Sequence, residues 1–82
     1  MTEPNAVVVI RTYPALRAAL AARRKALGLS QLALDEIAGV HTGYTGKIEC
    51  GARHLGDMSF EVMLAALGIE LVVRPRDRGA PA

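Results

Sequence analysis

The sequence predicts a mainly α-helical domain, a compact bundle of four short helices with a short β-strand near each end. Apolar residues recur at helical spacing in four stretches, and each stretch ends at a glycine, which readily takes the left-handed conformation of a helix C-terminus. These glycines are Gly28, Gly39, Gly51 and Gly68. Outside the helices, residues 7–10 and 69–74 are rich in β-branched side chains, which favours strands.

The first helix is expected to run from Pro14 to about Leu27. Thr12 is a good N-cap, and a proline is tolerated in the first turn because the N–H that it lacks has no partner there. One face of this helix is apolar and also carries an arginine. The face consists of Leu16, Ala19, Leu20, Arg23 or Arg24, and Leu27.

The second and third helices, residues 31–38 and 42–49, are expected to meet at a tight corner. Ser30 is the N-cap of the second helix, and His41 or Thr42 is the N-cap of the third. The core positions of the second helix are Leu34, Ile37 and Ala38. A corner this short makes the helices cross steeply and leaves one exposed helix free to enter a groove.

Asp57 or Ser59 is expected to be the N-cap of a fourth helix, which ends before Gly68. Its apolar face consists of Phe60, Met63, Leu64 and Leu67. The two predicted strands are too short to stand alone, so they are expected to pair with each other, with the strands of a second subunit, or with both.

The 82 residues are expected to form one small domain, residues 7–74, between a disordered tail at 1–6 and a mobile basic tail at 75–82. A domain of this size buries only about 60% of the surface that its unfolded chain exposes. No pair of cysteines can add a disulfide, because Cys50 is the single cysteine. We therefore expect the fold to gain stability by forming a homodimer.

Residues suited to catalysis or to metal binding are scarce. His41, Cys50 and His54 do not have the paired spacing of a structural zinc site, and Cys50 has no base beside it. The segment GYTGK lacks the preceding strand and the full spacing of a phosphate-binding loop. The sequence therefore predicts neither an enzyme, nor a cofactor, nor a metal site.

The compartment is expected to be the cytoplasm. A lone cysteine fits a reducing environment, and no apolar run approaches the roughly 20 residues that span a membrane. The N-terminus has no basic start, and its run VVVI is too short for a signal peptide. The formal charge of +2 permits nucleic-acid binding without arguing for it.

The corner resembles the helix-turn-helix of the phage-repressor family, also called Cro-like or xenobiotic-response-element (XRE) regulators. The matching residues are Ser30-Gln31, Leu34, Ala38-Gly39-Val40, and Lys47-Ile48-Glu49 with Gly51. The resemblance covers about Leu16 to Gly68. It implies a regulator that binds double-stranded DNA as a homodimer, most simply a repressor, and that associates with the nucleoid through DNA.

The resemblance also implies roles for individual residues. Gln31 would hold a phosphate at the start of the second helix. Thr42, Gly43 and Lys47 would face the bases, with His41 beside them. Tyr44 would belong partly to the core. Two alternatives stay open for its hydroxyl, which either contacts the DNA backbone or stays within the protein. The residues expected to contact phosphates in the loop after the third helix are Arg53 and His54.

An ion pair and two departures from the family pattern complete the comparison. Arg24 and Glu49 stand where the family has an ion pair that braces the reading helix. Asp35 replaces a small alanine, and Gly43 and Gly46 each weaken the third helix by about 0.8–1 kcal/mol relative to alanine. In one account the glycines allow close approach while Asp35 bonds to the third helix or to Tyr44. In the other, few side chains read bases and specificity comes from DNA shape.

Two other functions compete with operator binding. A C-terminal strand that closes a dimer resembles the HipB-type antitoxins, which implies an interaction module that neutralises a toxin and regulates its own operon. A helix-turn-helix that has lost DNA binding is a weaker possibility, which the two glycines of the third helix make conceivable.

Overall fold

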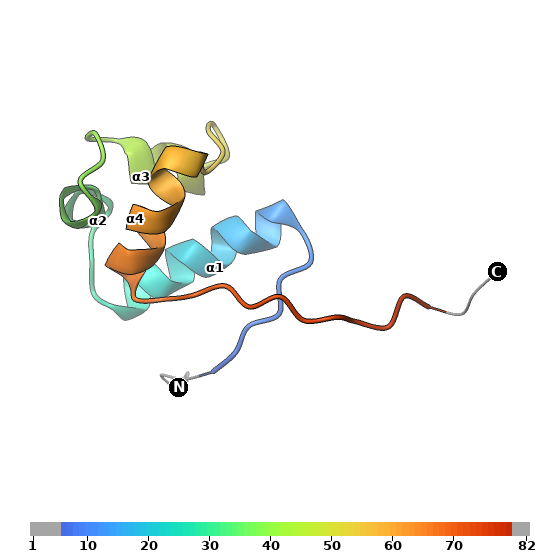
Figure 1. Ribbon diagram of the computed structural model, residues 1–82. Coiled ribbons are helices and arrows are strands. Elements are labelled where there is room, and N and C mark those ends of the chain that lie inside the picture. The colour runs from blue at the N-terminus through green and yellow to red at the C-terminus, as the bar shows by residue number, and fades with distance from the viewer. Residues whose placement is uncertain (1–5, 80–82) are drawn as a thin grey trace.

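Four α-helices make up the folded part of the chain, and the computed structural model describes residues 6–79. The helices are α1 (Tyr13–Ala26), α2 (Gln31–Ala38), α3 (Tyr44–Glu49) and α4 (Asp57–Leu67). Helices α1 and α2 each pack against both α3 and α4, and Figure 1 shows the resulting bundle. The mainly helical fold predicted from the sequence is confirmed.

The helices begin and end close to where the sequence predicts, apart from the starts of α3 and α4. The N-cap of α4 is Gly56, not Asp57 or Ser59 as predicted, so Asp57 is already the first residue of the helix. The Thr12 hydroxyl oxygen accepts a hydrogen bond from the Ala15 N–H at 3.1 Å, and the Ser30 hydroxyl oxygen accepts one from the Ala33 N–H at 3.0 Å. Gly39 caps the end of α2 in the left-handed conformation, with φ 74°. These local caps satisfy backbone groups that a helix end leaves without partners.

The core lies where the four helices meet. It consists of Leu20, Leu34, Ala38, Tyr44, Ile48, Met63 and Leu67. Ile37 was predicted to join it, yet its side chain is 58% exposed. The buried face of α2 is centred on Ala38 and includes Asp35, which places Ile37 about 100° away around the helix axis. Phe60 was also expected on the apolar face of its helix, yet it is 37% exposed and is not part of the core.

Helix α3 is shorter than the predicted range 42–49, because Thr42 and Gly43 precede its first turn. Gly43 has φ 93°, a left-handed conformation that cannot continue an α-helix. The N-cap is therefore Gly43, not His41 or Thr42 as predicted. The glycine allows a reversal of the chain immediately before α3.

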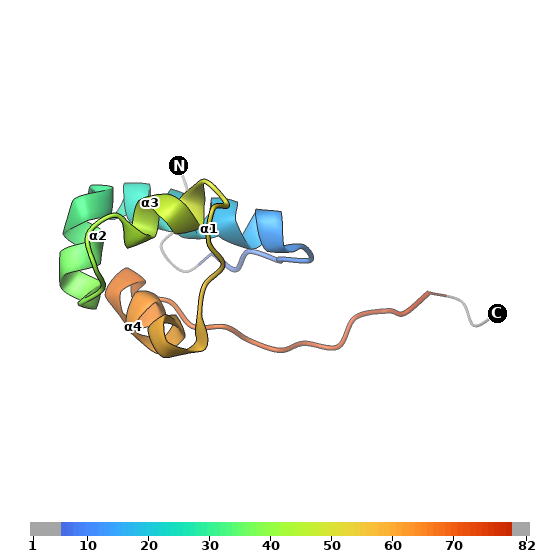
Figure 2. The ribbon, with the colours of Figure 1, turned by 90° about the horizontal axis from the view of Figure 1, so that it is seen from above.

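The two predicted terminal strands are absent from residues 6–79, and this part of the prediction is wrong for the single chain. Residues 7–10 and 69–74 carry no regular secondary structure, and Val7 and Val73 are 83% and 98% exposed. A strand needs a hydrogen-bonding partner, and within this chain neither segment provides one for the other. Figures 1 and 2 show the C-terminal segment leading away from the helices as an extended arm.

The two predicted tails lie partly outside the described residues. Residues 1–5 and 80–82 are not described, while Ala6 and residues 75–79 have no regular secondary structure. No helix in the described part of the chain is both long and apolar enough to cross a membrane.

Candidate nucleic-acid interface

A buried carboxylate from α2 caps the start of α3. Asp35 Oδ2 accepts a hydrogen bond from the Gly43 N–H at 2.8 Å, and Asp35 Oδ1 accepts one from the Thr45 N–H at 2.8 Å. Helix α3 has no capping side chain of its own. Asp35 was expected in one account to bond to the third helix or to Tyr44. Its bonds run to backbone N–H groups at the start of that helix and not to Tyr44. The Asp35 carboxylate therefore fixes the corner between α2 and α3.

The environment of Asp35 favours its charged form. Burial by itself would raise the pKa of this carboxyl, whose residue is only 2% exposed. The hydrogen bonds from Thr45 and Gly43, together with the nearby His41, outweigh burial and hold the pKa of Asp35 below its ordinary value. The cap is consequently ionised at neutral pH.

A second clamp joins the end of α3 to α1 and to the start of α2. Arg24 Nε and Nη2 donate to the two oxygens of Glu49, at 2.7 and 3.1 Å. Arg24 Nη1 also donates to the carbonyl oxygen of Leu29, and Gln31 Nε2 donates to Glu49 at 2.9 Å. The ion pair expected between Arg24 and Glu49 is therefore present, and Gln31 extends it.

The Glu49 carboxylate is stabilised in its charged form by this clamp. Burial would raise its pKa, but the hydrogen bonds from Arg24 and Gln31 lower the pKa below its ordinary value. Gly46 makes room for the clamp, since a Cβ there would lie 3.2 Å from the Gln31 side-chain oxygen. The glycine thus permits close approach of α2 and α3, as one of the two accounts expected.

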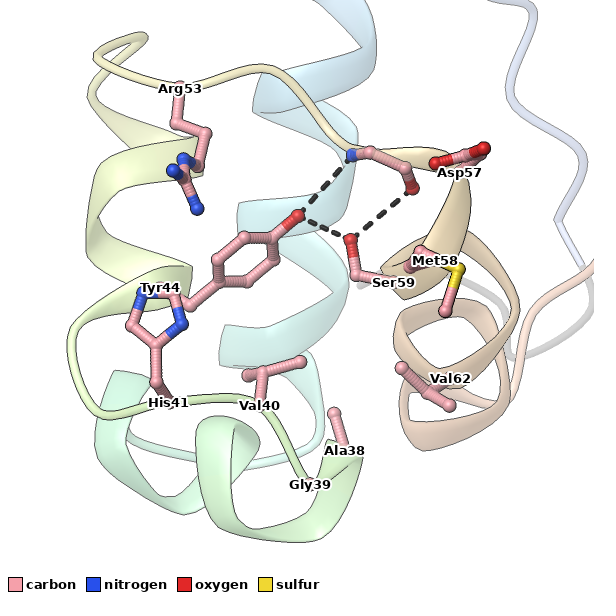
Figure 3. A pocket seen from close by; sticks show the side chains of 11 residues that line it. Ala38, Gly39, Val40, His41, Tyr44, Arg53, Asp57, Met58, Ser59 and Val62 are labelled. Atoms are coloured by element: carbon pink, nitrogen blue, oxygen red, sulfur yellow. Dashed lines mark hydrogen bonds between the residues drawn. The ribbon is translucent and has the colours of Figure 1, made fainter.

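Tyr44 is a core residue whose hydroxyl is used inside the protein. Tyr44 is 5% exposed. Its hydroxyl hydrogen-bonds with the Ser59 hydroxyl and accepts a hydrogen bond from the Gly56 N–H at 3.3 Å. Figure 3 shows these bonds at the start of α4. The hydroxyl therefore connects α3 to α4 and does not face the solvent side of α3. The sequence carried no sign of the partners Ser59 and Gly56.

The solvent side of α3 is formed by small residues and one cation. Lys47 is exposed in the middle of the helix, and Cys50 is exposed just after it. His41, Thr42 and Gly43 are exposed in the turn that leads into α3. The expected base-facing residues are thus exposed, with Thr42 and Gly43 before the helix instead of within it.

The loop between α3 and α4 holds the two other cationic candidates in different places. The Arg53 guanidinium lies 5.9 Å from the centre of the Tyr44 ring, beside a hollow of about 570 Å³ between the end of α2 and the starts of α3 and α4. Figure 3 shows Arg53 and His41 on opposite sides of Tyr44 at this hollow. His54 lies instead against the Tyr13 ring, with ring centres 4.8 Å apart.

The described residues contain no group of three or more His, Cys, Asp or Glu side chains placed to hold a metal ion. Neither a protein-family model nor a curated protein matches the chain.

Proposed function

We propose that the protein is a sequence-specific DNA-binding regulator of the Cro-like helix-turn-helix type, which represses transcription as a homodimer and reads the major groove with α3. The observation that carries this proposal is the pairing of a rigid corner with an unobstructed helix. The Asp35 cap and the Arg24–Glu49–Gln31 clamp hold α3 at both ends. The side of α3 that faces solvent bears no bulky side chain apart from Lys47.

The dimensions and chemistry of this corner suit DNA. A major groove about 12 Å wide admits an α-helix, and the exposed Gly43 lets the backbone at the start of α3 approach the bases closely. Lys47 can donate to the O6 and N7 atoms of guanine, while Thr42 and His41 lie at the N-terminal end, which usually meets base edges. Because few side chains face the groove, DNA shape would supply part of the specificity.

Cationic and polar groups around α3 supply phosphate contacts in this proposal. Gln31 keeps a second amide N–H beyond the one that it donates to Glu49, and it lies at the N-terminus of α2. Arg53 and His54 are exposed in the loop after α3.

Selection of bound sequences from a pool of random DNA duplexes tests the proposal. We expect the protein to enrich one motif, and we expect Lys47→Ala to relax the preference at one position in each half-site, with a loss of about 1–3 kcal/mol. The matched variant is Arg53→Ala, which should weaken all sequences alike. It should also reduce the slope of log affinity against log salt by about one for each lost contact. Failure of the parent to enrich any motif at low salt would refute the proposal.

We further propose that the exposed terminal segments become β-strands when two chains associate. Residues 7–10 and 69–74 carry β-branched side chains, and their unpaired backbone groups can template a second chain. A twofold dimer could place two copies of α3 about 34 Å apart, one turn of DNA.

Sedimentation measurements test this dimer. The full chain should sediment as a dimer at micromolar concentration, and a chain that ends at Gly68 should be a monomer. A chain that ends at Pro75 keeps the arm but lacks the basic tail, so it should remain dimeric. A full chain that stays monomeric at every concentration, or a dimer that survives truncation at Gly68, would contradict strand pairing.

The exposure of the C-terminal segment, residues 69–74, favours a second candidate function, an antitoxin that binds a toxin. Leu71, Val72 and Val73 are 51%, 77% and 98% exposed, which suits insertion into another protein. Purification of the protein from its native host would reveal a stoichiometric second protein in this case. A homodimer alone, bound to its DNA motif, would favour the repressor.

A further inference from the structure

The start of α1 is attached to the loop that follows α3. The Tyr13 hydroxyl oxygen accepts a hydrogen bond from the Leu55 N–H at 2.6 Å. The Tyr13 ring also packs edge-on against the His54 ring. These contacts place the first turns of α1 beside the exit of α3, although the two segments are far apart in the sequence.

The Arg17 guanidinium lies against both Tyr13 and Gly51, which together form its seat. Its guanidinium carbon lies 5.6 Å from the centre of the Tyr13 ring, a distance suited to a cation–π contact. On another side it lies against Gly51, where an added Cβ would come within 3.4 Å of Arg17 Cζ and 3.5 Å of Nη2. Gly51 has φ 82°, so both its backbone conformation and the space beside it favour glycine.

The Arg17 guanidinium has N–H groups that donate to no acceptor within the described residues. Within residues 6–79, Arg17 donates no hydrogen bond and forms no ion pair, although it is partly buried. The other arginines of α1 differ, since Arg23 donates to the carbonyl oxygen of Leu67 and Arg24 binds Glu49. The structure therefore holds Arg17 in place without using its hydrogen-bonding groups.

Arg17 lies beside the residues that follow α3. Lys47 is exposed within the helix and Cys50 just after it, and Arg17 lies against the next residue, Gly51. A six-residue helix is about 9 Å long, and the major groove is about 12 Å wide. With α3 in the groove, a group just beyond its end can therefore approach the phosphates that border the groove.

From this geometry we infer that Arg17 binds a backbone phosphate at the edge of each half-site, with Tyr13 and Gly51 as its seat. The inference rests on the proposed function, because it assumes that α3 lies in the major groove. The ligand is a phosphodiester, whose oxygens the planar guanidinium can bind through two parallel hydrogen bonds. The binding surface thus extends from the corner onto α1.

The salt dependence of binding tests the inference with Arg17→Gln, measured on the duplex that the parent selects. The slope of log affinity against log salt should fall by about 0.9 for each chain in the complex. Over roughly a fourfold rise in salt, the parent should lose about 3.5-fold more affinity per chain than the variant. Arg17→Lys keeps the charge and should keep the slope. Arg23→Gln, on the same helix, should also keep it.

Ethylation of single phosphates provides a readout that a purely structural Arg17 would not change. Ethylating the contacted phosphate should weaken the parent and leave Arg17→Gln unaffected, while the other sensitive phosphates stay the same for both proteins. A variant with the parent's slope and the parent's full set of sensitive phosphates would overturn the inference. The proposed function would still stand if Lys47→Ala relaxes the sequence preference. Absence of DNA binding by the parent would overturn both.

Discussion

Replacing Arg24 with methionine is expected to lower the free energy of unfolding by about 3–5 kcal/mol. The Arg24 and Glu49 side chains are 10% and 13% exposed, so removal of the cation leaves a carboxylate buried with only Gln31 as a partner. The change also leaves the Leu29 carbonyl oxygen without its donor. Urea denaturation at neutral pH measures the loss, and Glu49→Ala should produce one of similar size.

Two further variants separate the buried charge from the general packing of α1. The double variant Arg24→Met/Glu49→Leu strands no charge and should recover much of the lost stability. Arg23→Gln removes a single hydrogen bond to the Leu67 carbonyl oxygen, so it should cost only about 1 kcal/mol. If Arg24→Met unfolds within about 1 kcal/mol of the parent, the ion pair behaves as a surface contact.

Replacing Asp35 with alanine is expected to lower the free energy of unfolding by about 2–4 kcal/mol. The Thr45 N–H would remain buried without an acceptor, and the Gly43 N–H would lose its partner in the turn. Because the cap fixes the start of α3, DNA affinity should fall even under conditions where the variant stays folded. Thermal unfolding followed by circular dichroism, together with binding to the selected duplex, measures both effects.

Thr45→Val is the matched control for the Asp35 variant. The Thr45 hydroxyl oxygen is buried with no hydrogen-bond partner in the described residues, whereas the backbone N–H that bonds to Asp35 is kept. The control keeps both hydrogen bonds of the cap and should therefore lose far less stability than Asp35→Ala. An Asp35→Ala variant that unfolds like Thr45→Val would show that the cap contributes little.

The Asp35 cap also makes stability depend on acid pH. The pKa of Asp35 is lower in the folded chain than its ordinary value of about 3.9, so the folded state binds the proton less readily than the unfolded state. Its contribution is complete above that value and is lost as the pH falls through the folded-state pKa. Asp35→Asn should therefore weaken the loss of stability below about pH 4, and the part that remains should belong chiefly to Glu49.

The boundaries of α1 and α2 and the end of α4 could be predicted because the interactions that set them are local. A hydroxyl cap such as Thr12 or Ser30 bonds to an N–H three residues along the chain, and the glycines that follow the helices need only their own backbone freedom. The Arg24–Glu49 pair spans 25 residues, and it was expected only through a family resemblance. Gln31, a third member of that clamp, was expected to contact only a phosphate.

Tertiary structure decided the contacts between groups that are distant in the sequence. Asp35 lies on α2 and caps the start of α3, because the chain turns at the left-handed Gly39 and brings the Gly43 N–H to the Asp35 carboxylate. No sequence pattern within α3 predicts this cap. Tyr44 directs its hydroxyl to the start of α4 for the same kind of reason. The β-branched runs at 7–10 and 69–74 favour strands by composition alone. A strand also requires backbone hydrogen bonds to a second segment, and residues 6–79 supply none to them.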